Sequence, residues 1–162
     1  MKILGIDPGT AIVGWGVVET GSNHPKPIAY GHIETPAGDE LPDRLARIAH
    51  ELDSIIETHA PDESAVEELF FAKNTKTAMS VAQARGAIVL TLRRDRLPVF
   101  GYTPNQVKQA LTSYGHADKR QMQVMVKSIL KLDSTPKPDD VADALAVAVC
   151  HAFSRKTNSL LK

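Results

Sequence analysis

The order of strand-like and helix-like segments is the feature of this sequence that most constrains its fold. Three β-rich runs come first, separated by turns that contain Gly, Pro or Asn: Lys2–Asp7, Ile12–Thr20 and Ile28–Glu34. Closely spaced runs of this kind favour an antiparallel meander. After residue 40 the apolar residues recur in steps of three and four, which is typical of an amphipathic helix, and helical and extended segments then alternate. The pattern predicts one mixed α/β domain.

The later elements are predicted from periodicity and from capping residues. They are a helix from Leu41 to about Ala60, a strand over Ser64–Leu69, a helix over Thr75–Arg94, a strand from near Leu97 to Thr103, a helix after Thr103-Pro104, a helix after Asp118, and a helix over Asp139–Phe153. Alanines fill much of the last helix, so that helix can approach a sheet closely.

Length and composition set the class of protein. The 162 residues fit one domain, since domains typically have about 100–200 residues, and 43% hydrophobic residues suffice for a core. We expect residues 1–154 to form a single domain and residues 155–162 to form a disordered tail. The single cysteine, Cys150, excludes a disulfide framework and a zinc site made of several thiolates. We find no signal peptide or membrane span in the sequence, and therefore expect a cytoplasmic protein.

The net charge of zero hides a strong asymmetry along the chain. Residues 1–71 hold 4 Lys or Arg and 13 Asp or Glu, whereas residues 72–131 hold 11 and 2, which gives this basic segment a net charge of +9. Charge asymmetry of this kind suggests a polyanion partner. A solvated basic helix face is the alternative.

Carboxylates follow two of the predicted strands. Asp7 comes at the end of the first strand, before the tight turn Pro8-Gly9-Thr10. Asp also favours turns for purely local reasons, so this residue alone is ambiguous. Glu67 and Glu68 end a buried run, where an unpaired charge is costly. Adjacent residues on a strand point to opposite faces, so only one of the two can join Asp7.

A third acidic group opens the last predicted helix. Asp139, Asp140 and Asp143 lie in its first turns, where acids also favour the helix dipole. Asp140 and Asp143 are three residues apart and share a face. Together with Asp7 and one of the two glutamates they give a possible cluster of four carboxylates. Oxygen ligands without histidine or thiol suit Mg²⁺ or Mn²⁺, and a pair of such ions suits phosphoryl transfer to water.

These motifs resemble the RuvC family of bacterial Holliday junction resolvases over essentially the whole chain. The matching segments are Gly5-Ile6-Asp7-Pro8-Gly9-Thr10, Ala65-Val66-Glu67, Phe70-Phe71-Ala72-Lys73-Asn74, Gln83-Ala84-Arg85-Gly86, Gln106-Val107-Lys108-Gln109, and Asp140-Val141-Ala142-Asp143-Ala144-Leu145-Ala146. The resemblance implies a ribonuclease-H-like domain: a mixed five-stranded sheet, three strands antiparallel and then parallel strands, with helices on both faces.

The resemblance also implies an activity and its residues. The enzyme would be a structure-selective endonuclease that resolves four-way DNA junctions by paired symmetric nicks in recombination and repair, leaving 5′-phosphate and 3′-hydroxyl ends. The catalytic and metal-binding residues would be Asp7, Glu67, Asp140 and Asp143. The cofactor would be Mg²⁺, two ions per subunit, with Mn²⁺ as a substitute. Glu68 and Asp139 fall outside the matching positions, which leaves them as surface or capping residues.

Four residues are assigned to DNA by the same resemblance. Lys108 and Lys119 match lysines near the scissile phosphate, and Lys73 is assigned to DNA binding as well. Phe70 matches an aromatic residue that stacks on bases near the crossover, although a core phenylalanine is an equal alternative. Ala11 stands where family members often carry Arg, which removes one possible phosphate contact but no metal ligand.

A symmetric homodimer is expected, because a junction must be cut in two strands and each chain offers one acid cluster. The expected interface is one face of the second helix, made of Met79, Ala82, Gly86 and Val89. A tight interface there would explain Gly86, which costs about 1 kcal/mol of helix propensity relative to Ala. The resemblance implies RuvA and RuvB, the branch-migration complex, as further partners.

Three other functions are compatible with parts of the sequence. The Gly-Ile-Asp-Pro-Gly-Thr start also resembles the phosphate loop of actin-like ATPases and sugar kinases, which need two such domains. A second possibility is another ribonuclease-H-like nuclease, such as one that processes ribosomal RNA precursors. That family lacks both the Phe-Phe-Ala-Lys-Asn segment that begins at Phe70 and the Gln-Val-Lys-Gln segment that contains Lys108. A third is a junction-binding module without catalysis, against which the four acids argue.

Overall fold

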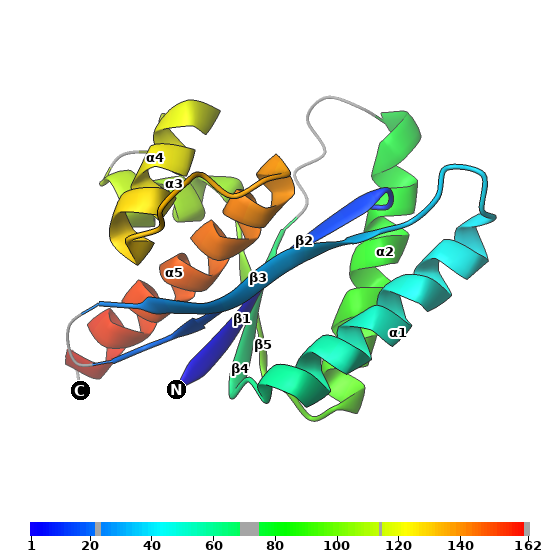
Figure 1. The fold of residues 1–162 in the computed structure, drawn as a ribbon, viewed down its shortest axis with the longest axis horizontal. Coiled ribbons are helices and arrows are strands. Elements are labelled where there is room, and N and C mark those ends of the chain that lie inside the picture. Colours follow the sequence, from blue (N-terminus) through cyan, green and yellow to red (C-terminus); the bar gives the residue numbers. More distant parts are fainter. Residues whose placement is uncertain (22–23, 69–74, 114, 161–162) are drawn as a thin grey trace.

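The computed structural model describes residues 1–21, 24–68, 75–113 and 115–160 and contains a five-stranded sheet with helices on both faces (Figure 1). The strands are β1 (Lys2–Asp7), β2 (Ile12–Glu19), β3 (Lys26–Glu34), β4 (Glu63–Glu67) and β5 (Val99–Tyr102). Their order across the sheet is β3-β2-β1-β4-β5. The first three pair antiparallel, and β4 and β5 continue the sheet in parallel from β1. The predicted fold class is therefore confirmed.

Two hydrophobic layers sandwich the sheet. The helices are α1 (Leu41–His59), α2 (Thr75–Arg94), α3 (Pro104–Thr112), α4 (Lys119–Leu130) and α5 (Asp139–Leu160). Helices α1 and α2 cover one face, while α5 crosses the other face with α3 and α4 packed on its outer side (Figure 1). Strand residues alternate between the layers: Leu4 and Ile6 pack with α1 and α2, whereas Ile3 packs with α5. Asp7 follows the same alternation as Ile3 and belongs to the α5 face.

Glycines on β1 and β2 let α5 press closely on the sheet. A Cβ at Gly5 would lie 2.2 Å from the Ala144 carbonyl oxygen, and one at Gly14 would lie 1.9 Å from the Asp140 carbonyl oxygen. Glycine inside a strand often marks such a close approach of another backbone. The expectation that an alanine-rich helix approaches the sheet closely is confirmed, because Ala144 and Ala148 pack against Gly5.

The helix starts follow their capping residues. Thr103 and Asp118 form capping boxes with Gln106 and Gln121, respectively, as the N-termini predicted for α3 and α4 require. These caps define the first residue of each helix, and thereby the positions of Lys108 on α3 and Lys119 on α4.

The largest difference from expectation is at the C-terminal end. Helix α5 continues past Phe153, where the apolar pattern ends, to Leu160. The structure therefore gives residues 155–160 a helical backbone, where the sequence favoured a disordered tail over 155–162. Polar residues can extend a helix without an apolar pattern, and Arg155 forms an ion pair of 3.1 Å with Glu63 of β4. The assignment of residues 1–154 to one domain stays a prediction. Within the described ranges, no helix is both long and apolar enough to cross a membrane.

Candidate active site

Asp7 and Glu67 lie side by side at the carboxyl ends of two neighbouring parallel strands. The register of β1 and β4 pairs Ile6 with Val66, so the next residue of each strand falls at the same edge of the sheet. Glu67 shares a strand face with Ala65, which packs in the α5 layer. The two carboxyl groups share a hydrogen bond. Alternation thus selects Glu67, and not Glu68, as the neighbour of Asp7.

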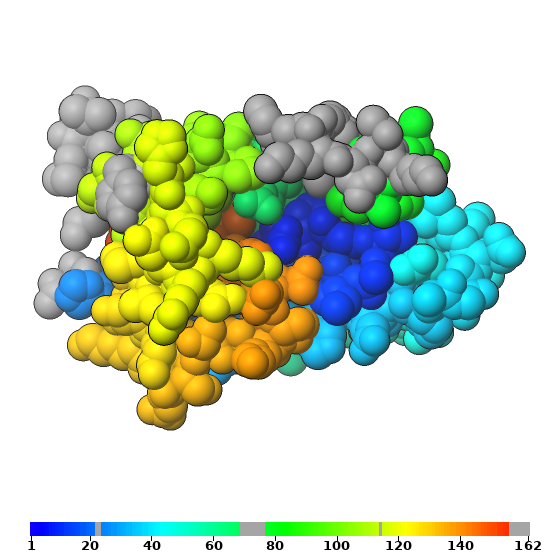
Figure 2. Space-filling model, turned by 90° about the horizontal axis from the view of Figure 1, so that it is seen from above, coloured from blue at the N-terminus to red at the C-terminus, as the bar shows by residue number. Residues whose placement is uncertain are grey.

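The start of α5 brings the other two acids to the same edge. Gly14 of β2 is the sheet partner of Asp7 and also touches the main chain of Asp140. Asp140 and Asp143 are both close enough to raise the pKa of Asp7 through their charges. Figure 2 shows the first residues of α5 beside the segment that holds the end of β1 and its turn. Three separate elements therefore supply the four acids.

The electrostatics of this cluster are unfavourable without a cation. Burial raises the pKa of Asp7 well above its ordinary value, and the charges of Glu67 and Asp143 raise it further. Burial also raises the pKa of Glu67, although its hydrogen bond to Asp7 opposes the rise. The pKa of Asp143 is raised chiefly by burial, against the opposing charge of Lys119. Crowded, partly desolvated carboxylates of this kind hold protons until a cation replaces them.

Two predicted lysines adjoin the acids. Lys108 of α3 is near enough to Glu67 for its charge to lower the pKa of that carboxyl group. Lys119, the first residue of α4, has its Nζ 3.1 Å from Asp139 Oδ2 and 3.7 Å from Asp143 Oδ2. Burial acts to lower the pKa of Lys119, but the hydrogen bond to Asp139 and the charges of Asp143 and Asp139 raise it overall.

The donor set fits a divalent cation that prefers oxygen. Four carboxylates from three elements offer oxygen ligands only, which suits a hard ion better than zinc. Burial and the charges of neighbouring acids raise the pKa values of Asp7, Glu67 and Asp143, so a bound cation would stabilise their charged forms. Among the residues that the structure describes, no three acidic, histidine or cysteine side chains converge into a complete metal site. Instead, the carboxyl group of Asp7 is hydrogen-bonded to that of Glu67, while Asp143 Oδ2 faces Lys119 Nζ.

The remaining predicted residues fall elsewhere or outside the described ranges. Phe70 and Lys73 lie outside the described residues. Glu68 is exposed, just after β4. On α2, Met79 is 70% exposed, and a Cβ at Gly86 would meet nothing within 4 Å, so this face of the helix is open. Ala82 and Val89 of the same face are half-buried.

Three residues that adjoin the acid cluster or the open face of α2 were not identified from the sequence. Gly14 leaves room for the main chain of Asp140 to approach β2, and the signal for it was a glycine inside a strand pattern. Arg85 of α2 donates from Nε to the Glu67 main-chain oxygen at 3.2 Å, and no sequence signal reveals that contact. Leu90, 70% exposed, extends the open face of α2 and follows from its position four residues after Gly86.

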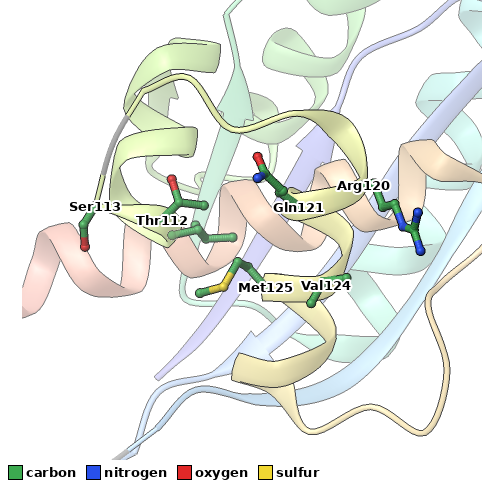
Figure 3. Close-up of a pocket in the computed structure, with 7 residues that line it drawn as sticks. Thr112, Ser113, Arg120, Gln121, Val124 and Met125 are labelled. Atoms are coloured by element: carbon green, nitrogen blue, oxygen red, sulfur yellow. The ribbon is translucent and has the colours of Figure 1, made fainter.

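A pocket lies apart from the acids, between α3 and α4 (Figure 3). Its volume is about 410 Å³, and its lining is Leu111, Thr112, Ser113, Arg120, Gln121, Val124 and Met125. None of these residues belongs to the acid cluster. The candidate active site is therefore the open, charged edge of the sheet and not this mainly apolar pocket.

The sheet order, with acids at the ends of β1 and β4 and at the start of α5, defines the chain as a ribonuclease-H-like protein. Comparisons with known proteins narrow this class. The family model described as crossover junction endodeoxyribonuclease RuvC matches residues 3–151. The chain is 54% identical to the RuvC of Brevibacillus brevis over 155 residues, which covers 96% of this chain and 93% of that protein. The chain belongs to the RuvC family.

Solved structures agree with this assignment. The structure of Thermus thermophilus RuvC in complex with Holliday junction substrate matches with a TM-score of 0.92 and 35% identity, covering 98% of this chain and 97% of that one. The yeast mitochondrial Holliday junction resolvase matches with a TM-score of 0.65 at 13% identity, covering 97% of this chain and 83% of that one, which supports the fold alone.

Proposed function

We propose that this protein is a crossover junction endodeoxyribonuclease that resolves four-way DNA junctions in bacterial recombination and repair, in the cytoplasm. The observation that carries the proposal is the match of residues 3–151 to the RuvC family, supported by the influence of the Glu67, Asp140 and Asp143 charges on Asp7. The expected products are two symmetric nicks with 5′-phosphate and 3′-hydroxyl ends.

We assign the catalytic and metal-binding roles to Asp7, Glu67, Asp140 and Asp143, with two Mg²⁺ ions per subunit and Mn²⁺ as a substitute. Such ions, when bound, polarise the phosphate and lower the pKa of the attacking water. The protein holds these ligands rigidly on strand ends and a helix start. The raised pKa values of Asp7 and Glu67 favour their protonated forms, and divalent ions held by these residues would favour the charged carboxylates instead.

The basic segment is assigned to DNA. Lys108 and Lys119 would bind phosphates beside the acids, and Lys73 would add a further phosphate contact. Phosphate contacts position a substrate without reading its sequence, which suits recognition of a branched shape. Phe70 is proposed to stack on bases near the crossover.

The working unit is proposed to be a homodimer, because each chain supplies one acid cluster and two strands must be cut. The proposed interface is the face of α2 that holds Met79, Ala82, Gly86 and Val89. Support comes from the exposed Met79 and Leu90 on this helix and from the open space at Gly86. RuvA and RuvB remain proposed partners by family resemblance. Light scattering that showed a monomer at micromolar concentration would contradict the dimer.

Cleavage of a synthetic four-way junction, compared with linear duplex of the same sequence and with RNA, tests the proposed function. With Mg²⁺ the wild-type protein should nick two opposing junction strands and leave the linear duplex and the RNA intact; without metal it should bind the junction and not cut. Preferred cutting of RNA would support a different ribonuclease-H-like nuclease, and metal-dependent binding without cutting would support an inactive module.

Six amide variants test the assignment of the acids. No cutting is expected from four of them: Asp7→Asn, Glu67→Gln, Asp140→Asn and Asp143→Asn. Junction binding without metal should survive or tighten in these variants, because a negative charge near the phosphate is gone. Glu68→Gln is the matched control, and both Glu68→Gln and Asp139→Asn should still cut. An inactive Asp139→Asn protein beside an active Asp140→Asn protein would show that the assignment is shifted by one residue.

A further inference from the structure

Asp139 is the one acid at the start of α5 that the proposed metal site does not use, yet both of its oxygens are engaged. Oδ2 lies 3.1 Å from Lys119 Nζ, and Oδ1 accepts a hydrogen bond of 2.9 Å from Gln123 Nε2. The distance from Lys119 Nζ to Asp143 Oδ2 is longer, 3.7 Å. Asp139 is therefore the nearer anchor of the Lys119 ammonium group.

The contact depends on how α4 and α5 face each other. Lys119 and Gln123 are four residues apart on α4, and Asp139 and Asp143 are four residues apart on α5, so each pair shares one helix face. The two faces meet through the three polar contacts around Asp139 and Asp143. The amide of Gln123 donates to one oxygen of Asp139, and the ammonium group of Lys119 lies against the other.

A lysine needs such an anchor more than an arginine does. Its ammonium group sits on a flexible four-carbon stem, and the side chain of Lys119 is 58% exposed. A divalent ion on Asp143 would use that carboxylate and add positive charge close by, which repels Lys119. Asp139 lies outside the proposed ligand set, so its attraction for Lys119 remains when the ion is bound.

We propose that Asp139, oriented by Gln123, is a positioning residue that keeps the Lys119 ammonium group beside the acid cluster when the cluster holds metal. The proposal rests on the proposed function, since Lys119 matters to catalysis only if this site cuts phosphodiester bonds. Asp139 touches neither metal nor substrate; it acts through Lys119. The Asp139→Asn protein should therefore still cut, but more slowly.

The first test measures Lys119 itself, without metal or DNA. Amine modification of Lys119 at pH 8, followed by mass spectrometry, should be about threefold faster in Asp139→Asn, because loss of the ion pair leaves the amine more available to the reagent. Exposed ion pairs change the equilibrium between paired and free side chains by about fivefold at most, which sets the size of the effect. Gln123→Leu should give a smaller increase. Asp133→Asn removes the same charge from the exposed loop between α4 and α5 and should leave Lys119 reactivity unchanged.

The second test measures single-turnover cutting of a four-way junction at saturating Mg²⁺ and saturating DNA. Asp139→Asn should lower the rate about threefold while junction affinity is unchanged or higher. In the Lys119→Ala background the same change should have no further effect, because the two residues would act as a unit.

The outcomes separate this proposal from the function on which it rests. Wild-type protein that fails to cut junctions would overturn the proposed function, whereas the Lys119 reactivity would still report the contact. Normal wild-type cutting with unchanged Lys119 reactivity in Asp139→Asn would overturn the positioning role. So would a threefold loss that persists in the Lys119→Ala background, since that result means Asp139 acts through the fold and not through Lys119.

Discussion

Replacing Gly14 by alanine should separate the two halves of the candidate active site without changing any acid. A Cβ at this position would lie 1.9 Å from the carbonyl oxygen and 2.3 Å from the carbonyl carbon of Asp140. Real Cβ atoms essentially never come within 3.0 Å of another heavy atom, so the start of α5 must move by roughly 1 Å. The obstacle is main chain, which cannot rotate away. No described glycine has a positive φ, so the effect is steric and not a matter of backbone strain.

The expected magnitudes follow from that displacement. Overpacking of a close contact costs about 1–3 kcal/mol of unfolding free energy. For a protein of this size each kcal/mol lowers the melting temperature by about 2–4 °C, so a loss of about 2–12 °C is expected. Because Asp140 moves with the helix while its partner Asp7 stays on the sheet, cutting should fall about 100-fold, which is typical for a misplacement of about 1 Å.

Single-turnover junction cutting at 20 °C and thermal unfolding measure the two effects, with circular dichroism to show that the variant is folded at the assay temperature. Gly38→Ala is the matched control, because a Cβ at Gly38 meets nothing within 4 Å; it should cut at the wild-type rate. A Gly14→Ala protein with the wild-type melting temperature and cutting rate would refute the argument that this contact sets the position of Asp140.

Three further predictions concern charge. The folded-state pKa of Asp7 is raised, so its contribution to stability is complete at low pH and is lost as pH rises through that pKa. Without metal at pH 8, Asp7→Asn should therefore have a higher free energy of unfolding than wild type, by about 1.4 kcal/mol for each pH unit between the folded and unfolded pKa, and a higher melting temperature. Added Mg²⁺ should stabilise only the wild type. Lys108→Ala should weaken junction binding equally for all junction sequences and reduce the slope of log K against log salt by about one. Burial lowers the pKa of His151 despite its 2.7 Å contact with Glu63, so stability should fall as pH drops below the ordinary value of 6.5 toward the lowered pKa, and melting between pH 7.5 and 5 should show a smaller fall in His151→Gln.

Local patterns were enough to predict the elements that carry the acids. Side-chain alternation along a strand can be read from the sequence, so it was clear that only one of Glu67 and Glu68 could join Asp7. The choice of Glu67 came from the family resemblance, and the register of β1 and β4 in the structure agrees with it. The capping residues Thr103 and Asp118 likewise predicted the starts of α3 and α4, and the structure confirms both. Periodicity and caps act over a few residues, so they can be read without the fold.

Contacts between distant elements could not be predicted in this way. The sequence separates Gln123 from Asp139 by a loop, and nothing in either helix pattern reveals that their side chains meet. The glycine at position 14 signals a close approach, but only the fold shows that the approaching chain is the main chain of Asp140. The length of α5 was underestimated because its last turns are polar and Arg155 finds its partner, Glu63, on a strand far away in sequence.

Helix α5 must hold repelling acids in place, and its contacts with the sheet between Asp140 and His151 explain how it can. Without metal, the charges of Asp140 and Asp143 disfavour the charged form of Asp7, so repulsion among the ionised acids would push the start of the helix from the sheet. Close packing on Gly5 and Gly14 opposes that push along the first half of the helix. Near the other end, the buried His151 contacts both Glu63 of β4 and Tyr102 of β5, each at 2.7 Å. A helix held to the sheet at these points resists tilting, so the repulsion is relieved by protons on the acids or, in their place, by cations.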